Sequence, residues 1–547
     1  MSHPSKRRVA MVATAVLALS LTACSGGGDD APAGPDLSSN KVGAMATYNV
    51  GDQFKATEPV SFSMLYNNHP NYPLKDDWLF WSELNKRTNV KLDNVAVPLS
   101  DYEQKRSVLI GAGDAPFIIP KSYPHQEDPF VSSGAILPVS DYIDLMPNFK
   151  DKVAKWNLQP EINTLRQEDG KYYLLPGLHE RSWQDYSLAI RTDILDQLKL
   201  KAPTTWEELY TVLKAMKQAY PDIYPFSDRW SKPTPGGSLF NILGASYGAP
   251  GGWGYQHAAW DDKAKKFFYA GASDKYKQWV TYLNKLVTEG LLDPESFTQT
   301  DDAARQKLAN GKSFVISANA QVLVNDYRAD LAATNPNAKL TKIPLPIGPE
   351  GEVNPASRLE NGIMISTKAR DSKNFVAMMQ FIDWLWYSDA GQEFSKWGVQ
   401  GVTFNKDSAG KDTLADDVNV VGLHPSATKH LQKDFGFYNG VFAYGGKPEL
   451  VQAFFSTEEQ SFQKVMNARR PAVVPPPHPF SDEEREQASL WETPLRDYVF
   501  QQTLAFILGQ RPLSQWDAYV TELKGKNMDQ YMELVDKAYQ RYKSAHG

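Results

Sequence analysis

Apolar and polar residues alternate with a period of two in several short segments. Between these segments lie others in which apolar residues recur at the spacing of an α-helix. PVSFSMLYN (59–67) and VKLDNVAV (90–97) have the strand pattern, and FIIP (117–120) is a short apolar strand. Residues 78–88 and 102–111, between these strands, have helical spacing. This order predicts an α/β sheet with ligand loops at the carboxyl ends of the strands.

The same alternation continues through the rest of the chain. DGKYYLLPG (169–177) predicts a turn followed by a strand, and GKSFVISANA (311–320) and GIMIS (362–366) predict two more strands. Capping boxes predict helix starts at Thr205 with Glu208 and at Ser481 with Glu484. Helices are expected at 205–220, 274–289, 300–310, 372–388, 481–508 and 514–543.

The amino terminus has the layout of a secretory signal peptide. Lys6, Arg7 and Arg8 precede a charge-free run from Val9 to Ala23. This run is shorter than the roughly 20 residues that a membrane-spanning helix needs. We therefore expect residues 1–23 to be a signal peptide and the chain to be exported.

Residues 21–24, LTAC, resemble a bacterial lipobox, and Cys24 is the only cysteine of the chain. A single thiol makes no internal disulfide, so acylation of Cys24 is the favoured reading and an incidental cysteine is the alternative. Residues 24–56 are rich in Gly, Ser, Asp, Pro and Ala, which predicts a flexible tether. The expected location is the extracellular face of a bacterial cell membrane, with a Gram-positive envelope favoured.

Composition narrows the function of the remaining residues, which are too many for one core and predict at least two lobes. A net charge of -6 gives no basic field for nucleic acid, whereas aromatic residues make up 12% and include 14 Trp. HExxH, Walker-loop and metal-spaced Cys/His motifs are absent from the sequence. We expect a monomeric binding protein that is not an enzyme and has no cofactor or metal. A lipid-anchored glycoside hydrolase, which needs two carboxylates, is the least favoured alternative.

Several phrases carry a resemblance to a known family. They are DGKYYLLP (169–176), IRTDILDQLKLKAPTTWEELYTVLKAMK (190–217), LNKLVTEGLLDPESF (283–297) and WLWYSDAGQEFSKWGVQGVTF (384–404). Together with the lipobox they resemble the large extracellular solute-binding lipoproteins of ABC importers. Within that group the chain is most similar to carbohydrate binders related to the alginate-binding proteins.

The resemblance implies a type II periplasmic-binding-protein fold: two α/β lobes with a hinge, and a helix-rich C-terminal part. Lobe I is expected at 57–178 plus about 318–395, and lobe II at about 179–317 plus 396–547. The implied function is capture of an oligosaccharide between the lobes and delivery to a membrane permease. An oligopeptide-binding lipoprotein is the alternative, although the many Trp residues favour sugar.

One departure from the family concerns calcium. Alginate binders of this family resemble an EF-hand at the end of the helix corresponding to 205–220, but KQAYPDIYPFSDR (217–229) has no DxNxNG spacing, with Asp222 the single acid near the helix end. We therefore expect no calcium at this place. NKDSAGKD (405–412) lacks an oxygen ligand at the fifth loop position and is predicted to be a hairpin turn.

The candidate ligand contacts come from polar and aromatic loops near strand ends. Sugars present C–H faces and hydroxyl groups, so aromatic platforms and paired polar side chains suit them. For the loops at 66–72 and 433–446, a helix-capping turn and an aromatic pad between the lobes are the alternatives. The candidate ligand-binding residues are Asn67, Asn68, His69, His179, Arg181, Trp183, Asp228, Arg229, Trp230, Trp253, Tyr255, Asn319, Glu360, Asn361, Phe435 and Tyr438.

Overall fold

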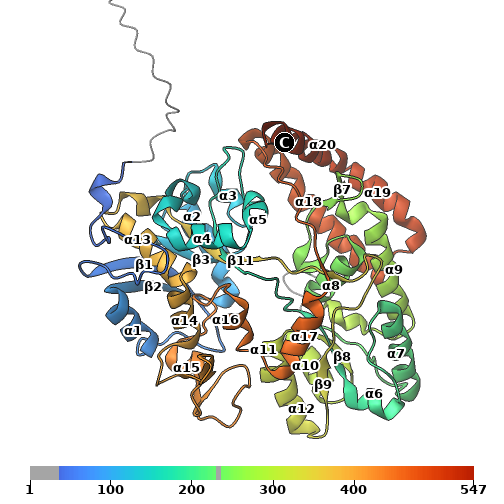
Figure 1. Ribbon diagram of the computed structural model, residues 1–547. Coiled ribbons are helices and arrows are strands. Elements are labelled where there is room, and N and C mark those ends of the chain that lie inside the picture. Colours follow the sequence, from blue (N-terminus) through green and yellow to red (C-terminus); the bar gives the residue numbers. More distant parts are fainter. Residues whose placement is uncertain (1–35, 230–233, 235, 547) are drawn as a thin grey trace, which may run out of the picture. The chain divides into compact units, whose positions relative to one another are not determined.

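The computed structural model describes residues 36–229, 234 and 236–546 (Figure 1). The expected signal peptide, Cys24 and Trp230 lie outside the described residues. The strands are β1 (Val60–Asn68), β2 (Val90–Pro98), β3 (Ile118–Ser122), β4 (Leu175–Leu178), β5 (Ser187–Arg191), β6 (Ala258–Asp261), β7 (Lys266–Tyr269), β8 (Val315–Ala318), β9 (Leu340–Lys342), β10 (Val353–Asn354), β11 (Leu359–Ile365), β12 (Phe404–Lys406), β13 (Asp412–Leu414), β14 (Val418–Asn419), β15 (Lys429–His430) and β16 (Arg470–Pro471).

The helices follow the strands closely in the first part of the chain and dominate its end. They are α1 (Leu79–Thr88), α2 (Tyr102–Gly111), α3 (Asp128–Val131), α4 (Pro147–Lys155), α5 (Gln159–Asn163), α6 (Thr192–Leu198), α7 (Trp206–Ala219), α8 (Gly237–Tyr247), α9 (Asp274–Thr288), α10 (Asp301–Ala309), α11 (Ala320–Val322), α12 (Arg328–Thr334), α13 (Phe375–Ile382), α14 (Asp389–Trp397), α15 (Leu431–Phe435), α16 (Pro448–Gln452), α17 (Thr457–Asn467), α18 (Asp482–Ile507), α19 (Trp516–Lys524) and α20 (Met528–His546).

The first sheet has the order β2-β1-β3-β11-β4. Strands β1, β2 and β3 are parallel, whereas β11 runs antiparallel between β3 and β4. Its residues alternate between two faces, since Phe62, Met64 and Tyr66 join one core cluster and Leu65 joins another. Helices cover both faces, so the predicted α/β architecture is confirmed (Figure 1).

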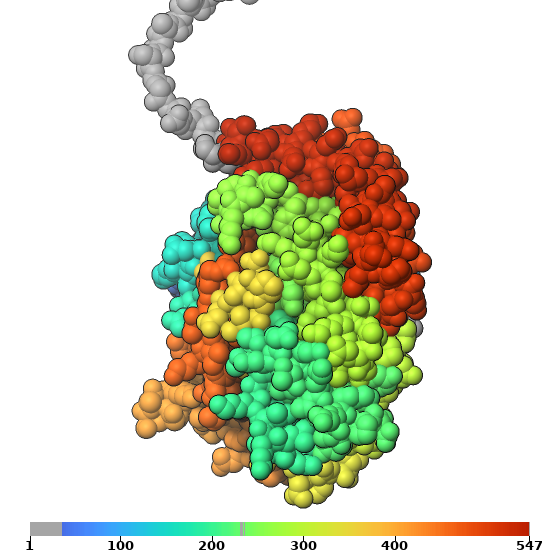
Figure 2. Space-filling model, turned by 90° about the vertical axis from the view of Figure 1, so that its right-hand side faces the viewer, coloured from blue at the N-terminus to red at the C-terminus, as the bar shows by residue number. Residues whose placement is uncertain are grey.

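The second sheet has the order β8-β5-β9, with β5 antiparallel to both neighbours. Leu188, Ile190 and Val315 face a large core, and Ala189 and Ile316 face a smaller one formed with α10 and α12. The large core also takes in residues of α18, α19 and α20. Figure 2 shows these C-terminal helices, in red, beside the green segments of the second sheet's half.

Most predicted elements have the expected type and bounds within a few residues. Both capping boxes are present, at Thr205 with Glu208 and at Ser481 with Glu484. β12 and β13 pair antiparallel, which confirms the hairpin turn at 405–412. The single helix expected at 514–543 is wrong: α19 and α20 are separate, because Asn527 between them has a left-handed backbone with φ of 69°.

The expected flexible tether is also shorter than the composition suggested. Residues 37–56 pack on the first sheet's half, where Phe54 is fully buried. Asn40 Nδ2 donates to the carbonyl oxygens of Arg370 and Ser372, at 3.0 and 2.8 Å. A few anchoring side chains in a small-residue segment are therefore enough to order it.

The two large cores divide the chain at places other than the expected lobe boundaries. The first core contains residues up to Leu178 and then residues between Leu359 and Phe454. The second contains residues between Leu188 and Leu345 and again from Phe462 onward. Residues 404–454 therefore pack with the first sheet, because their aromatic side chains fill its core. Among the described residues, none of the helices combines the length and apolarity needed to cross a bilayer.

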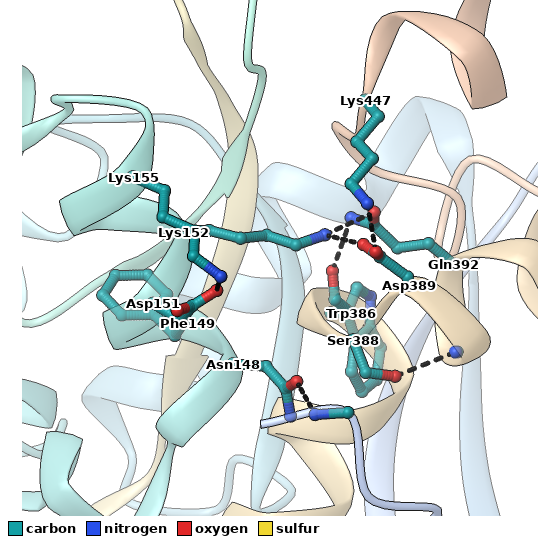
Figure 3. Close-up of polar contacts among 12 residues, drawn as sticks. Asn148, Phe149, Asp151, Lys152, Lys155, Trp386, Ser388, Asp389, Gln392 and Lys447 are labelled. Atoms are coloured by element: carbon teal, nitrogen blue, oxygen red, sulfur yellow. Dashed lines mark hydrogen bonds and ion pairs between the residues drawn. The ribbon is translucent and has the colours of Figure 1, made fainter. Parts of the chain in front are cut away.

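A partly buried polar network joins α4 to α14 in the first half (Figure 3). Lys152 Nζ donates to Gln392 Oε1 at 2.9 Å and lies 3.0 Å from Asp389 Oδ1, while Lys447 pairs with the other oxygen of Asp389. Gln392 Nε2 donates to the carbonyl oxygen of Trp386 at 2.9 Å. One buried amide thus satisfies an ammonium group and a backbone carbonyl together.

We expect Gln392→Ala to lower the free energy of unfolding by about 1–3 kcal/mol, because the buried Trp386 carbonyl oxygen loses its side-chain donor and Lys152 loses one of its two acceptors. Urea unfolding monitored by circular dichroism measures this. Glu393→Ala is the matched control, since Glu393 lies next in the same helix but makes a half-exposed ion pair with Lys406. Equal losses in the two variants would contradict a structural role of the network.

Candidate ligand-binding site

Polar side chains gather at one edge of the first sheet. β1, β3 and β4 end there and β11 begins there, as the pairs Ser122 with Gly362 and Leu178 with Leu359 show. A matching edge exists on the second sheet, where β5 begins opposite the end of β8, with Ser187 paired to Ala318. β9 ends at this edge too.

The chain passes between the two sheets at these edges. The segment 179–186 leads from β4 to β5, and 343–358 leads from β9 to β11. Asn319 Nδ2 lies 3.5 Å from Asp185 Oδ2, so the end of β8 contacts the first crossover. The crossovers and the two edges form the candidate ligand-binding site.

His179 and Glu360 form the centre of the first edge. His179 Nε2 lies 2.9 Å from Glu360 Oε2, the same oxygen that accepts a hydrogen bond from Gly445 N at 2.9 Å. Burial disfavours the charge of Glu360, but His179 and the Gly445 N–H more than offset it and hold the pKa at about 2. Glu360 keeps 33% of its side chain exposed, so an ionised acceptor remains available to a ligand.

A second carboxylate stands at the crossover. Asp185 lies beside Lys342, whose Nζ donates to the Asp185 carbonyl oxygen at 3.1 Å and pairs with Glu459 at 2.7 Å. Burial raises the pKa of Asp185 to about 6, against the attraction of Lys342. Lys342 and Glu459 are themselves buried, so this ion pair fastens β9 and α17 to the crossover.

Other predicted residues of the first half occupy the same edge with different contacts. His69 stacks on Tyr72 with ring centroids 4.5 Å apart, and Asn68 Oδ1 accepts a hydrogen bond from Leu74 N at 2.9 Å. Tyr438 stacks on Phe454 at 4.2 Å and lies close enough to Asp185 and Glu360 to feel their charges. Asn67 and Asn361 are buried, and Asn361 Nδ2 donates to Glu360 Oε1 at 3.2 Å.

The segment around Trp183 lines a small pocket with α16 and α17. Arg181 and His179 line it with Trp183, whose ring lies 5.0 Å from Phe455. Arg181 is exposed, whereas Trp183 is half-buried. Trp183 thus has a packing partner in addition to any ligand.

The second edge carries charged and aromatic side chains. Asp228 is 1% exposed, and its Oδ1 accepts a hydrogen bond from Ser317 N at 2.8 Å. Burial raises the pKa of Asp228 to about 6. Arg229 lies 5.5 Å from the ring of Tyr327, and Asn319 Oδ1 caps α11 by accepting from Val322 N.

Of the two predicted Trp contacts that the structure describes, Trp253 is the more accessible, with 38% of its surface exposed, and it packs edge-on against Tyr186 at 5.0 Å. Tyr255 does not share this position. It packs against Phe500 and Tyr276 in the second core, because the backbone turns after Gly254 toward α18. Phe435 is likewise partly buried against the first core. The site predictions for Tyr255 and Phe435 therefore lack support from their positions.

Sequence reasoning missed several residues at these edges. Lys121 lies near the end of β3 and Tyr123 follows the strand directly, whereas Asp185 and Tyr186 precede β5. Burial disfavours the charge of Lys121, but Tyr123, Tyr72 and Glu360 raise its pKa above the ordinary value. Asn68 was predicted because a polar run directly follows the predicted strand at 59–67. The same rule applies to KSY (121–123), which follows the predicted strand at 117–120, and it would have identified Lys121 and Tyr123.

The protein has two α/β halves joined by crossovers, and polar and aromatic side chains lie along the linked edges. These features define the class of two-lobed solute receptors. The family model for bacterial extracellular solute-binding proteins matches residues 72–393, and the chain belongs to this family.

Relatives and solved structures agree with this assignment. The chain is 24% identical, over 85% of its length and 87% of the relative, to the fructooligosaccharide ABC transporter substrate-binding protein FusA of Streptococcus pneumoniae. It is 28% identical, over 59% of its length and 63% of the relative, to the polygalacturonan/rhamnogalacturonan-binding protein YtcQ of Bacillus subtilis. The structure of the alginate-binding protein AlgQ2 without calcium ion covers 89% of this chain and 99% of its own, with a TM-score of 0.69 and 22% identity. This likeness confirms the periplasmic-binding-protein fold.

We expect Glu360→Gln to change the pH dependence of stability. The folded-state pKa of Glu360 lies below its ordinary value, so its ionised form stabilises the protein above pH 4.5, and this contribution is lost as the pH falls toward 2. Urea unfolding at pH 7 and at pH 3 should show a larger stability difference between wild type and variant at pH 7. Asn284→Ala, an amide replacement in α9, is the control whose effect should not depend on pH. A Glu360→Gln difference that stays constant between the two pH values would contradict the lowered pKa of Glu360.

Proposed function

We propose that the protein binds an oligosaccharide between its two sheet edges and delivers it to the membrane permease of an ABC importer. The observation that carries this proposal is the pairing of charged donors and acceptors with flat aromatic side chains along the two edges and the crossovers. Glu360, Asp185 and Lys121 suit hydroxyl groups, which both donate and accept hydrogen bonds. Trp253, Tyr438 and Tyr123 offer ring faces for the C–H surfaces of a sugar.

The relatives support the same ligand class. FusA and YtcQ are named as binders of fructooligosaccharides and of polygalacturonan or rhamnogalacturonan, respectively. One relative takes neutral sugars and the other takes acidic ones, so the comparison favours carbohydrate without choosing the charge. The candidate ligand contacts are Asn68, His69, His179, Arg181, Trp183, Asp228, Arg229, Trp230, Trp253, Asn319, Glu360 and Tyr438, to which the structure adds Lys121, Tyr123, Asp185 and Tyr186.

Binding is proposed to close the two halves around the sugar. The core membership supports a first lobe of about 37–178 plus 359–454 and a second lobe of about 188–345 plus 462–546, with the crossovers as the hinge. A ligand that contacts both edges stabilises the closed arrangement over the open one. The permease then distinguishes loaded from empty receptors by the arrangement of the lobes.

The protein is proposed to bind sugar without cleaving it. Its relatives are named as binding proteins. Glu360 is held ionised by His179, which suits a hydrogen-bond acceptor better than the protonated general acid that a glycosidase needs. Release of reducing sugar by the purified protein would overturn this part of the proposal.

Titration of tryptophan fluorescence with oligosaccharide pools and with peptide pools tests the ligand class. We expect saturable changes with sugars only, and saturation by peptides would identify a peptide receptor instead.

Trp253→Ala should weaken sugar binding by about 1–3 kcal/mol with little change in thermal stability, because the ring is exposed.

Trp260→Ala is the matched control for this prediction. Trp260 packs between Phe267 and Tyr539 in the second half, so its loss should lower stability and leave sugar affinity unchanged. If Trp253→Ala binds sugar as tightly as wild type, Trp253 is not a ligand platform.

We also propose that Cys24 is acylated and anchors the receptor to the outer face of the membrane. Two or more acyl chains hold a protein firmly, because each buried CH2 contributes about 0.8 kcal/mol. In a bacterial host, Cys24→Ser should move the protein from the membrane fraction to the soluble fraction or medium and abolish labelling by a palmitate analogue. Retention of the label in Cys24→Ser would refute the anchor.

A further inference from the structure

A compact group of potential metal ligands lies in the loop between β3 and α3. His125, Glu127 and Asp128 bring one imidazole nitrogen and two carboxylate oxygens within 4.8 Å of one another. His125 Nδ1 is already 3.6 Å from Asp128 Oδ2. Nothing in the proposed sugar site uses these three side chains.

Glu127 is the unusual member of the group. It is 0% exposed, and neither of its carboxylate oxygens receives a hydrogen bond of ordinary geometry from a described residue. The N–H groups of Glu127 and His125 are its nearest backbone partners. A buried carboxylate without full hydrogen bonding is costly, so buried acids of this kind are normally paired or coordinate a metal.

Asp128 is held in position by residues outside the group. Gln167 Nε2 donates to Asp128 Oδ1 at 2.7 Å, which turns Oδ2 toward His125. Gln167 in turn accepts from Arg485 Nη2, an α18 side chain, at 2.7 Å. Outer partners that orient a ligating carboxylate in this way are typical of metal sites.

The backbone of the loop is shaped to bring the imidazole to the carboxylates. His125 has a φ of 74°, in the left-handed region that a histidine rarely adopts. Its side chain is 45% exposed, so it can turn toward a bound ion without disturbing the core. An unfavourable backbone conformation at His125, beside the carboxylates of Glu127 and Asp128, indicates that the loop has a functional role.

We propose that His125, Glu127 and Asp128 bind a divalent first-row transition cation, for which zinc is the probe. One imidazole and two carboxylates form a mixed nitrogen and oxygen set that suits zinc better than calcium or magnesium, and three protein ligands leave a fourth position for water. Zinc–ligand distances of about 2.0–2.2 Å place ligand atoms about 3.3 Å apart, so the group closes slightly around the ion.

Charge balance is compatible with the cation. Arg485 Nη1 lies 3.7 Å from Asp128 Oδ2, and its charge offsets one of the two carboxylates. Two carboxylates and one guanidinium leave a net negative charge at the group, so both Glu127 and Asp128 can ligate a divalent cation. Because Arg485 belongs to α18 and the loop follows Lys121 and Tyr123, a bound ion would fix the end of β3 beside the C-terminal helices. This site is independent of the proposed sugar binding.

Calorimetric titration of zinc into tag-free, metal-stripped protein tests the proposal. We expect one zinc per chain and a rise in Tm of about 2 °C or more at saturating zinc. Glu127→Gln and His125→Ala should each lower the zinc affinity at least tenfold. His125 is half exposed, so His125→Ala keeps the test valid even if the buried Glu127→Gln variant folds poorly.

His430→Ala is the matched control, because His430 also lies beside a carboxylate, that of Asp434, in another part of the first half. It should retain zinc binding of wild-type affinity. Absence of stoichiometric binding in wild type, unchanged affinity in the Glu127 and His125 variants, or an equal Tm rise with calcium would each overturn the proposal.

Discussion

The antiparallel insertion of β11 between β3 and β4 is the constraint on which the rest of the structure depends. It makes β11 begin where its neighbours end, so the returning chain and Glu360 arrive at the same edge as the loops after β1, β3 and β4. The close approach requires glycine, since a Cβ on Gly362 would lie 2.0 Å from the carbonyl oxygen of Leu175. Register shifts on both sides of Gly362 make the ladder irregular where Glu360 and Asn361 lie, at the edge itself.

Electrostatics along this edge are organised in compensated groups. Lys121 stands among Glu360 and two tyrosines, and Asp185 stands beside the Lys342–Glu459 pair. Such groups present donors and acceptors together without a strong field of either sign. A polyhydroxylated solute makes hydrogen bonds of both kinds, so this arrangement is well matched to it.

Local patterns predicted most of the fold because they reflect local physics. The period-two strands at 59–67 and 90–97 and the capped helix after Thr205 depend on burial and capping within a few residues. The place of β11 in the sheet, and the packing of 404–454 with the first core, depend on partners hundreds of residues away. Tyr255 shows the same limit, because its glycine-rich surroundings resembled a binding loop while its ring packs beneath α18. At the candidate site, the residues that directly follow strands were accessible to prediction, whereas His179 and Glu360 as a pair were not.

The buried pair of Lys342 and Glu459 is not itself among the candidate ligand contacts, yet it holds β9, α17 and the Asp185 carbonyl in one position. In an equilibrium between open and closed lobes, the strength of an ion pair at the crossover affects the fraction of molecules in the binding-competent form. Apparent affinity scales with that population. Evolution could thus retune the receptor for scarcer or more abundant nutrients without altering any atom that touches them.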